Sequence, residues 1–373
     1  MKQSLRSKKI QKCSTLGAEN IKVQKTNYDY TISGNIVYTN PSNNLIIGNI
    51  PKYRGTDNIR IGYNLNDLNL GDQSDQSSNI TIGNNCASIG TRSNCITIGS
   101  NSSQISQQDN CIAIGNNTGF YHQSQDSIAI GYNSGVSNKQ PLSVSIGTES
   151  GYTSQGYGAI AIGTYAGYSN QGSNSIAVGT YAGYSNMRPN CIGIGSNSCY
   201  ETNGSYIIAV GTNTCHTGAE EYSIAIGTDS GKFYKNQYSI SIGSNSGYSN
   251  QGKYAIAIGN NAGSFDQEPL AVAIGSNSGH VNQGLNSVVI GNNSGVSNLG
   301  RNSFIFGHNV KCEEENTIVF KTGGVDVETV IDSPGFYLIN CIRGSNLNIG
   351  GSPAGGWVVY DTDTKEFVYD IGP

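Results

Sequence analysis

The chain has 373 residues, of which 50 are glycine and only 12% are charged, with a net charge of −4. Glycine at about twice its ordinary frequency, without the period of collagen, indicates a turn-dominated chain. The weak acidic balance argues against nucleic acid or an anionic membrane as the main partner, since both need a basic surface. No apolar stretch reaches the ~18 residues of a membrane-spanning helix.

The first segment, residues 1–40, reads as a basic N-terminal tail. Its basic residues are Lys2, Arg6, Lys8, Lys9, Lys12, Lys22 and Lys25. It lacks the apolar core of a secretion signal, so we expect no export by that route. Such a tail docks on a larger particle or remains a solvated arm, and the sequence leaves both open.

Residues 41–78 carry a loose version of a short motif, apolar–x–apolar–Gly, at 45–48 and 59–62. From about 79 to 310 the motif becomes strictly periodic. Its glycines are Gly83, Gly99, Gly115, Gly131, Gly147, Gly163, Gly179, Gly195, Gly211, Gly227, Gly243, Gly259, Gly275, Gly291 and Gly307, always 16 residues apart. We therefore interpret 41–78 as irregular first coils and 79–310 as a regular array of 16-residue repeats.

Sixteen residues are too few for a helical hairpin, and the repeat lacks helix-forming periodicity. They fit one coil of an all-β parallel β-solenoid, with a strand, a turn, a second extended leg and a return turn. Coils that stack at about 4.8 Å would build a rod on the order of 70 Å long. Each position of the repeat then forms a column along the rod.

The strand of each repeat has two apolar residues that flank a small one. Alternation places the apolar pair on one face, and we predict that it forms the solenoid core: Ile112, Ile114, Ile128, Ile130, Ile160, Ile162, Ile224, Ile226, Ile256 and Ile258. The small residues point the other way, so we predict that they face a neighbouring subunit: Ala113, Ala129, Ala161, Ala177, Ala209, Ala225, Ala257 and Ala273.

The rest of the repeat is polar apart from an aromatic column. Its second leg, as in residues 169–172, has almost nothing apolar to bury, so a single solenoid looks under-stabilised and assembly is expected. The aromatic residues either cover this leg or form a ligand-binding stripe. The candidate ligand-facing residues are Tyr152, Tyr168, Tyr184 and Tyr200, together with Trp357 near the C-terminus.

Residues 311–373 are expected to form a C-terminal β cap or knob. Residues 317–320 resemble a strand, and 357–360 with 366–369 resemble a hairpin. Solenoid ends need caps to prevent edge-to-edge growth. The cap would therefore close the rod and set the register of the assembly, and a receptor-binding tip is the alternative.

The nine cysteines contain no C-x-x-C pair, which argues against a zinc ribbon. Cys95 with Cys111, and Cys199 with Cys215, lie one repeat apart and would stack within disulfide range. Alternatively, they are small fillers with free thiols. The sequence predicts no metal and no cofactor.

The sequence also contains no recognisable catalytic motif. Glu220 and Glu268 share a position in the repeat but lie three coils apart, roughly 14 Å, which is too far for paired carboxylates. No nucleophile motif or phosphate-binding loop occurs. We therefore expect no enzymatic activity.

The unit Ser-Ile-Ala-Ile-Gly-x-x-Ala/Ser-Gly-x-x-Asn-x-Gly in residues 79–310 resembles the head repeat of YadA-like trimeric autotransporter adhesins. It is also similar to repeats in fibre proteins of giant viruses and phages. The resemblance implies a left-handed parallel β-roll with three chains around one axis and the Ser-Ile-Ala-Ile-Gly strands innermost. The present repeat is longer than the adhesin repeat, so its outer turn should be longer.

The function expected from these features is a structural, non-enzymatic, homotrimeric fibre or surface protein. An Asn-, Ile-, Tyr- and Lys-rich composition is typical of AT-rich genomes, which favours a virion surface protein assembled in the host cytoplasm, with the tail bound to other virion proteins. The alternative is an extracellular or cell-surface adhesin that binds host glycan through its tip or aromatic stripe. A tailspike-type depolymerase is a third hypothesis.

Overall fold

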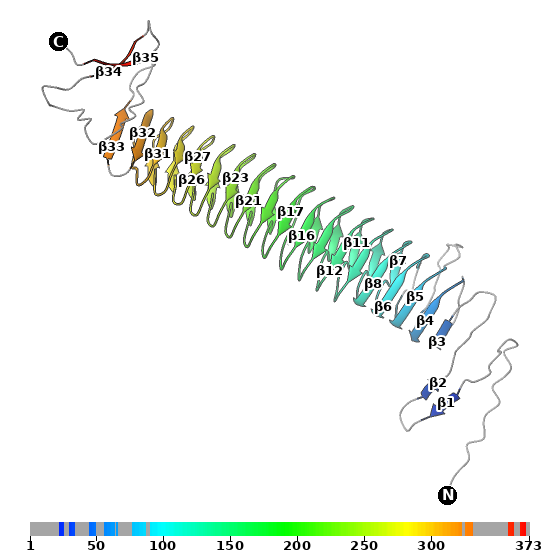
Figure 1. Ribbon diagram of the computed structural model, residues 1–373. Coiled ribbons are helices and arrows are strands. Elements are labelled where there is room, and N and C mark those ends of the chain that lie inside the picture. Colours follow the sequence, from blue (N-terminus) through cyan, green and yellow to red (C-terminus); the bar gives the residue numbers. More distant parts are fainter. Residues whose placement is uncertain are drawn as a thin grey trace.

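The structure is a computed structural model that describes residues 90–322 continuously, and also 22–25, 30–33, 45–49, 56–63, 65, 77–86, 325–330, 357–361 and 366–370. The described residues form strands and turns and contain no helix. Figure 1 shows coils stacked one on another into a long rod. The predicted all-β parallel solenoid is confirmed, while the left-handed winding and the trimer remain predictions.

One parallel sheet runs along the whole rod and contains the strand of each repeat. Its strands are β3 (Leu45–Asn49), β4 (Ile59–Tyr63), β5 (Ile80–Asn84), β6 (Ile96–Ser100), β8 (Ile112–Asn116), β10 (Ile128–Ile130), β12 (Val144–Ile146), β14 (Ile160–Ile162), β16 (Ile176–Val178), β17 (Ile192–Ile194), β19 (Ile208–Val210), β21 (Ile224–Ile226), β23 (Ile240–Ile242), β25 (Ile256–Ile258), β27 (Val272–Ile274), β29 (Val288–Ile290), β31 (Phe304–Gly307) and β32 (Thr317–Thr322). From β5 to β31 each residue pairs with the one 16 positions later, as Ile160 does with Ile176. The array therefore keeps one register.

The second leg of each coil forms a second row of parallel strands. These are β7 (Ile105–Gln107), β9 (Tyr121–Gln123), β11 (Ser137–Lys139), β13 (Thr153–Gln155), β15 (Ser169–Gln171), β18 (Glu201–Thr202), β20 (Thr217–Ala219), β22 (Phe233–Lys235), β24 (Ser249–Gln251), β26 (Phe265–Gln267), β28 (Val281–Gln283) and β30 (Ser297–Leu299). Between β15 and β18 the row continues through single bridges at Ser185. Two legs per coil match the predicted repeat.

Beyond the array, three short hairpin pairings are described. β1 (Lys22–Lys25) pairs with β2 (Tyr30–Ser33), and β33 (Val325–Val330) returns antiparallel on β32. β34 (Trp357–Asp361) pairs with β35 (Glu366–Asp370), which confirms the hairpin predicted there. The parallel sheet continues past 310 into β32. Most of the predicted tail, the side chain of Trp357, Cys13 and Cys341 lie outside the described residues.

The predicted core assignment was wrong, because the two faces of the strand are the reverse of what we expected. The alanines predicted to contact another subunit are fully buried inside the solenoid: Ala113, Ala129, Ala161, Ala177, Ala209, Ala225, Ala257 and Ala273. The isoleucines predicted to form the core lie on the outer face, half-buried or exposed: Ile112, Ile114, Ile128, Ile130, Ile160, Ile162, Ile224, Ile226, Ile256 and Ile258.

The physical reason is the narrow space between the two legs. A Cβ placed on Gly167 would lie only 3.1 Å from the Cβ of Ala161 in the same coil, so there is little free space between the two legs at this level. The small residues therefore pack at close range against the second leg of the same chain and not against a neighbouring subunit.

Towards the C-terminal end the interior becomes apolar. Val289 and Ile305 occupy the alanine position and cluster with Leu299, Val310 and Val319, all buried. This cluster closes the last coils of the described array with an ordinary hydrophobic core. It explains why the small-residue column ends in large residues.

Asparagine columns stabilise the turns. The side-chain amide of each asparagine donates to the amide oxygen of the one 16 residues later, as in the series Asn245, Asn261, Asn277 and Asn293, over 2.8–3.2 Å. Each of these residues has a φ near +50°, a conformation that asparagine tolerates better than most residues. The side-chain amides of the turn residues thus satisfy one another's hydrogen bonds from coil to coil.

Candidate functional site

The most prominent surface feature is an apolar strip on the outer face of the first sheet. Each strand contributes two side chains, and the shared register aligns them into two columns from Ile59 to Phe306. Ile162 is 37% exposed, Ile194 41% and Phe306 46%. Two parallel columns of half-buried to exposed isoleucine and valine form a continuous patch of the kind that marks an interaction surface.

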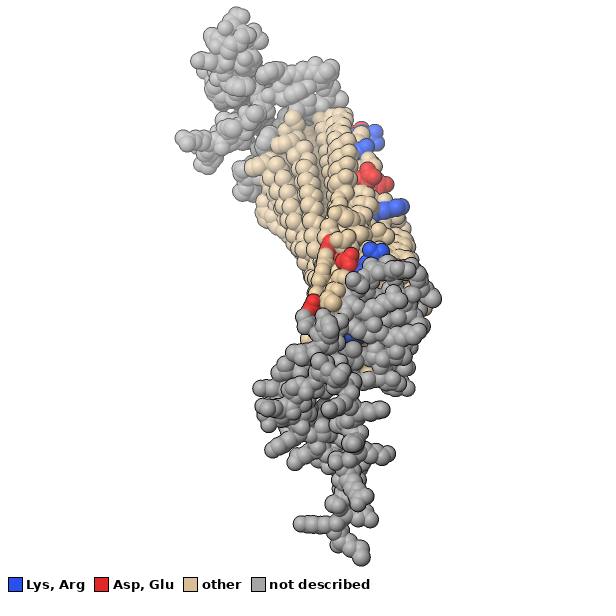
Figure 2. Space-filling model, turned by 90° about the vertical axis from the view of Figure 1, so that its right-hand side faces the viewer, with Lys and Arg blue, Asp and Glu red and all other residues tan. Residues whose placement is uncertain are grey.

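Charged side chains are sparse along the rod. On the face shown in Figure 2 most of them lie along one side, and most of the described surface in that view is uncharged. Two ion pairs occur among the described residues, Lys232 with Asp229 and Arg301 with Glu315. Little electrostatic repulsion therefore opposes close approach of a second rod.

The interior contains a polar column that the sequence interpretation missed. It is formed by buried glutamines of the second leg: Gln107, Gln123, Gln155, Gln171, Gln251, Gln267 and Gln283. The side-chain amide of Gln171 donates to the carbonyls of Ile160 (2.8 Å) and Ser175 (3.3 Å) across the lumen. The signal was in the sequence, because glutamine recurs there at 16-residue intervals.

Replacing Gln171 by leucine should lower the free energy of unfolding by about 2 kcal/mol, because two buried carbonyls lose their donor. Urea unfolding followed by circular dichroism measures the change. Asn170→Asp is the control, since Asp266 occupies the equivalent exposed position, and it should shift the midpoint far less. Equal shifts would contradict the role of the glutamine column.

The candidate ligand-facing tyrosines form one continuous stack. Ring centroids are 5.1 Å apart between Tyr152 and Tyr168, 5.0 Å between Tyr168 and Tyr184, and 4.9 Å between Tyr184 and Tyr200. The stack continues onto His216 at 4.8 Å. Because the rings cover one another's faces, edges and hydroxyl groups remain for solvent, which suits a covering role. Ligand binding by this column stays a prediction.

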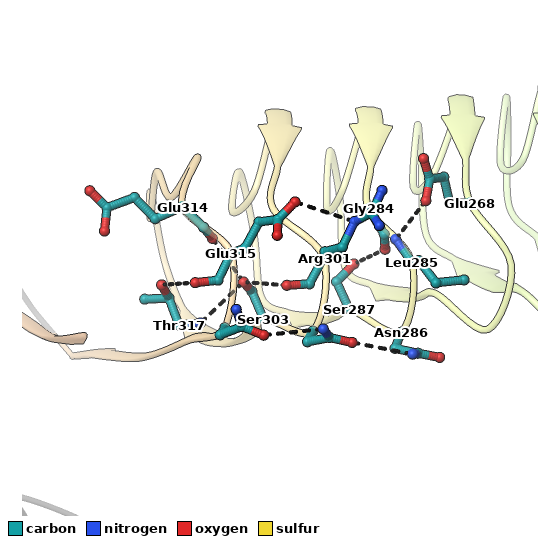
Figure 3. Close-up of polar contacts among 12 residues, drawn as sticks. Glu268, Gly284, Leu285, Asn286, Ser287, Arg301, Ser303, Glu314, Glu315 and Thr317 are labelled. Atoms are coloured by element: carbon teal, nitrogen blue, oxygen red, sulfur yellow. Dashed lines mark hydrogen bonds and ion pairs between the residues drawn. The ribbon is translucent and has the colours of Figure 1, made fainter. Parts of the chain in front are cut away.

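The carboxylates connect successive coils. Glu220 and Glu268 each accept a backbone N–H from the coil that follows, from Gln237 (3.3 Å) and Leu285 (3.0 Å). Figure 3 shows Glu268 in this role beside the ion pair of Arg301 with Glu315. No cluster of three metal-binding side chains occurs in the described part of the chain.

The described cysteines are buried free thiols: Cys86, Cys95, Cys111, Cys191, Cys199, Cys215 and Cys312. The thiols of Cys95 and Cys111 contact each other, and this contact together with burial raises the pKa of Cys95. Burial raises the pKa of Cys215 to about 12. The contact with Cys95 lowers the pKa of Cys111 to about 7. Buried free thiols at positions that most other coils fill with serine, alanine or glycine fit the filler interpretation.

Comparison with known proteins identifies no family. No family model matches this sequence, and the search of curated proteins finds no match. Among the described residues, no helix has the length and apolar character needed to cross a membrane. The function must therefore be argued from the surface and interior of the solenoid itself.

Proposed function

We propose that this chain is a structural, non-enzymatic subunit of a homotrimeric fibre or surface assembly, and that its copies meet along the isoleucine and valine strip. The observation that carries the proposal is the continuity of this strip over the array. Apolar surface of the strip that remains in contact with water is unfavourable by about 25 cal/mol for every Å² that contact between copies could bury. Contact between copies removes this cost along the full length of the rod.

The geometry of the strip fits copies of the same chain. Every coil adds the same two side chains at the same step, so a second rod in parallel alignment meets the first coil for coil. Each strand presents only two outward side chains, and narrow strips of this kind can converge around one axis. The resemblance of the repeat to YadA-like heads, which are trimeric, is the basis for proposing three chains in the assembly. The strip replaces the alanine column as the proposed contact surface.

The test is to place charge in the strip without changing the coil. Ile162→Asp combined with Ile226→Asp should convert a trimer into a folded monomer, because the outer side chains do not contribute to the interior. Light scattering after gel filtration gives the mass, and circular dichroism checks the fold. Wild-type protein should have three times the mass of one chain.

The matched control is Leu142→Asp with Leu270→Asp. Both leucines are about half exposed outside the strip, with a φ near +60°, and Asp126 occupies the equivalent position. This control adds the same charge and should remain trimeric. The proposal fails if the wild type is monomeric, or if the Ile162 and Ile226 variant keeps the wild-type mass.

A further inference from the structure

Two lysines lie inside the solenoid, at positions where other coils have glutamine. Lys139 on β11 and Lys235 on β22 are fully buried. Among the described residues, neither of them has an ion-pair partner. A buried ammonium without a counter-charge is costly, so these side chains need a specific physical account.

Each lysine contacts the same two groups of the next coil. The Nζ of Lys139 donates to the hydroxyl of Ser145 (2.7 Å) and to Oε1 of Gln155, and the Ser145 hydroxyl donates to the same Oε1 (2.7 Å). Lys235 repeats the arrangement with Ser241 (2.7 Å) and Gln251, where the serine-to-Oε1 distance is 2.6 Å.

The serine accompanies the lysine in the sequence. From β5 to β31 the central position of the first-sheet strand holds alanine, glycine, threonine, valine or isoleucine, and it holds serine only at Ser145 and Ser241. These are the two coils that directly follow the lysines. Two copies of one three-residue arrangement, six coils apart, indicate a built site.

The contacts fit a neutral amine. Each Nζ has two hydrogen-bond acceptors, the serine hydroxyl and the glutamine oxygen, which match the two N–H bonds of an uncharged amine. Burial lowers the pKa of Lys235 to about 7 and the pKa of Lys139 well below its ordinary value. An uncharged amine has a free electron pair and is a nucleophile.

We propose that each lysine forms an isopeptide bond with the glutamine of the next coil, Lys139 with Gln155 and Lys235 with Gln251. The Nζ–Cδ bond forms by attack of the amine electron pair on the side-chain amide. The Cδ–Nε2 bond then breaks, and the proton lost by Nζ leaves on Nε2, so that ammonia is released. No oxidant, reductant or second substrate takes part.

The surrounding groups hold the reacting amide in place. Nε2 of Gln155 donates to the carbonyls of Val144 (2.7 Å) and Ala159 (3.2 Å), which fixes the plane of the amide. The Ser145 hydroxyl donates to Oε1, where negative charge develops on attack, and it accepts from Nζ. It is therefore placed to stabilise the oxyanion and to carry the proton away from the amine. Fixed neighbours react as if at very high concentration.

Intact mass of the denatured, reduced protein tests the proposal. We expect a mass lower than that of the sequence by two molecules of ammonia, and tryptic cleavage should fail after Lys139 and Lys235. Lys139→Gln and Lys235→Gln restore the residue most often found at this position, so the coils should still form. Each single variant should lose one ammonia, and the double variant none.

Succinimide formation at Asn203–Gly204 would also release ammonia. The double variant separates the two reactions, because an ammonia loss caused by a succinimide would remain in it, whereas a loss caused by the isopeptide bonds would not. Ser145→Ala restores the common residue of the strand and should slow bond formation at Lys139 alone. The proposal is overturned if the wild-type mass equals the sequence mass, or if the double variant shows the same ammonia loss as the wild type.

Discussion

Gly163→Ala is expected to destabilise the solenoid by about 3 kcal/mol or more, although it adds a single methyl group. Gly163 has a φ of +129°, and a Cβ there would lie 2.6 Å from the carbonyl oxygen of Gly179. Because that oxygen belongs to the backbone of the next coil, relief would require separation of the coils. Urea unfolding followed by circular dichroism measures the loss.

Gly135→Ala is the control for this prediction. Gly135 also has a positive φ, +56°, but the nearest atoms to its Cβ would be side-chain rather than backbone atoms, 3.1 Å away on Lys139 and 3.2 Å away on Ala129. Cys199 and Cys215 occupy the equivalent position with similar φ values, so a Cβ is tolerated there. The expected cost is about 1 kcal/mol. A Gly163→Ala variant as stable as Gly135→Ala would contradict the stacking argument.

Ala161→Arg should prevent the central coils from folding. Ala161 has no exposed surface and faces the second leg of its own coil, so the variant must bury a charge and a long side chain in a filled space. The expected loss is several kcal/mol, comparable with the stability of a typical domain. Circular dichroism and limited proteolysis should show an unfolded segment.

A conservative replacement separates this effect from any effect on assembly. Ala161→Ser introduces the residue found at Ser145 and Ser241, and it should fold normally. The assignment of Ala161 to the interior would be contradicted by an Ala161→Arg protein that keeps the wild-type fold but has the mass of a monomer. That outcome would place the alanine column between subunits, as the sequence led us to expect.

The repeat could be predicted from the sequence because the backbone conformation of each coil requires particular residue types at fixed positions. The key glycines are required wherever one coil contacts the next, so their spacing of 16 reveals the length of the coil directly. Asparagines in the turns follow from the positive φ values of those positions. Fold class, coil length and the parallel stack therefore followed from local rules.

The facing of the strand could not be predicted in the same way. Alternation separates Ile160 and Ile162 from Ala161 but does not say which face is inside. The usual expectation places the larger apolar residues inside, and here the lumen is too narrow for them. The recurrent glutamine, exemplified by Gln171, was the missing signal. A long polar side chain that spans the lumen fills the space left by alanine and satisfies the backbone carbonyls.

The unbroken 16-residue period has a consequence for the size of the molecule. Every coil contacts only its two neighbours and contributes the same pairings, so a tandem duplication or loss of one unit leaves all other contacts unchanged. Each such event would alter the rod by one step of about 4.8 Å. The length of the rod can therefore change during evolution through the number of repeats, without any change in the sequence of the individual repeat.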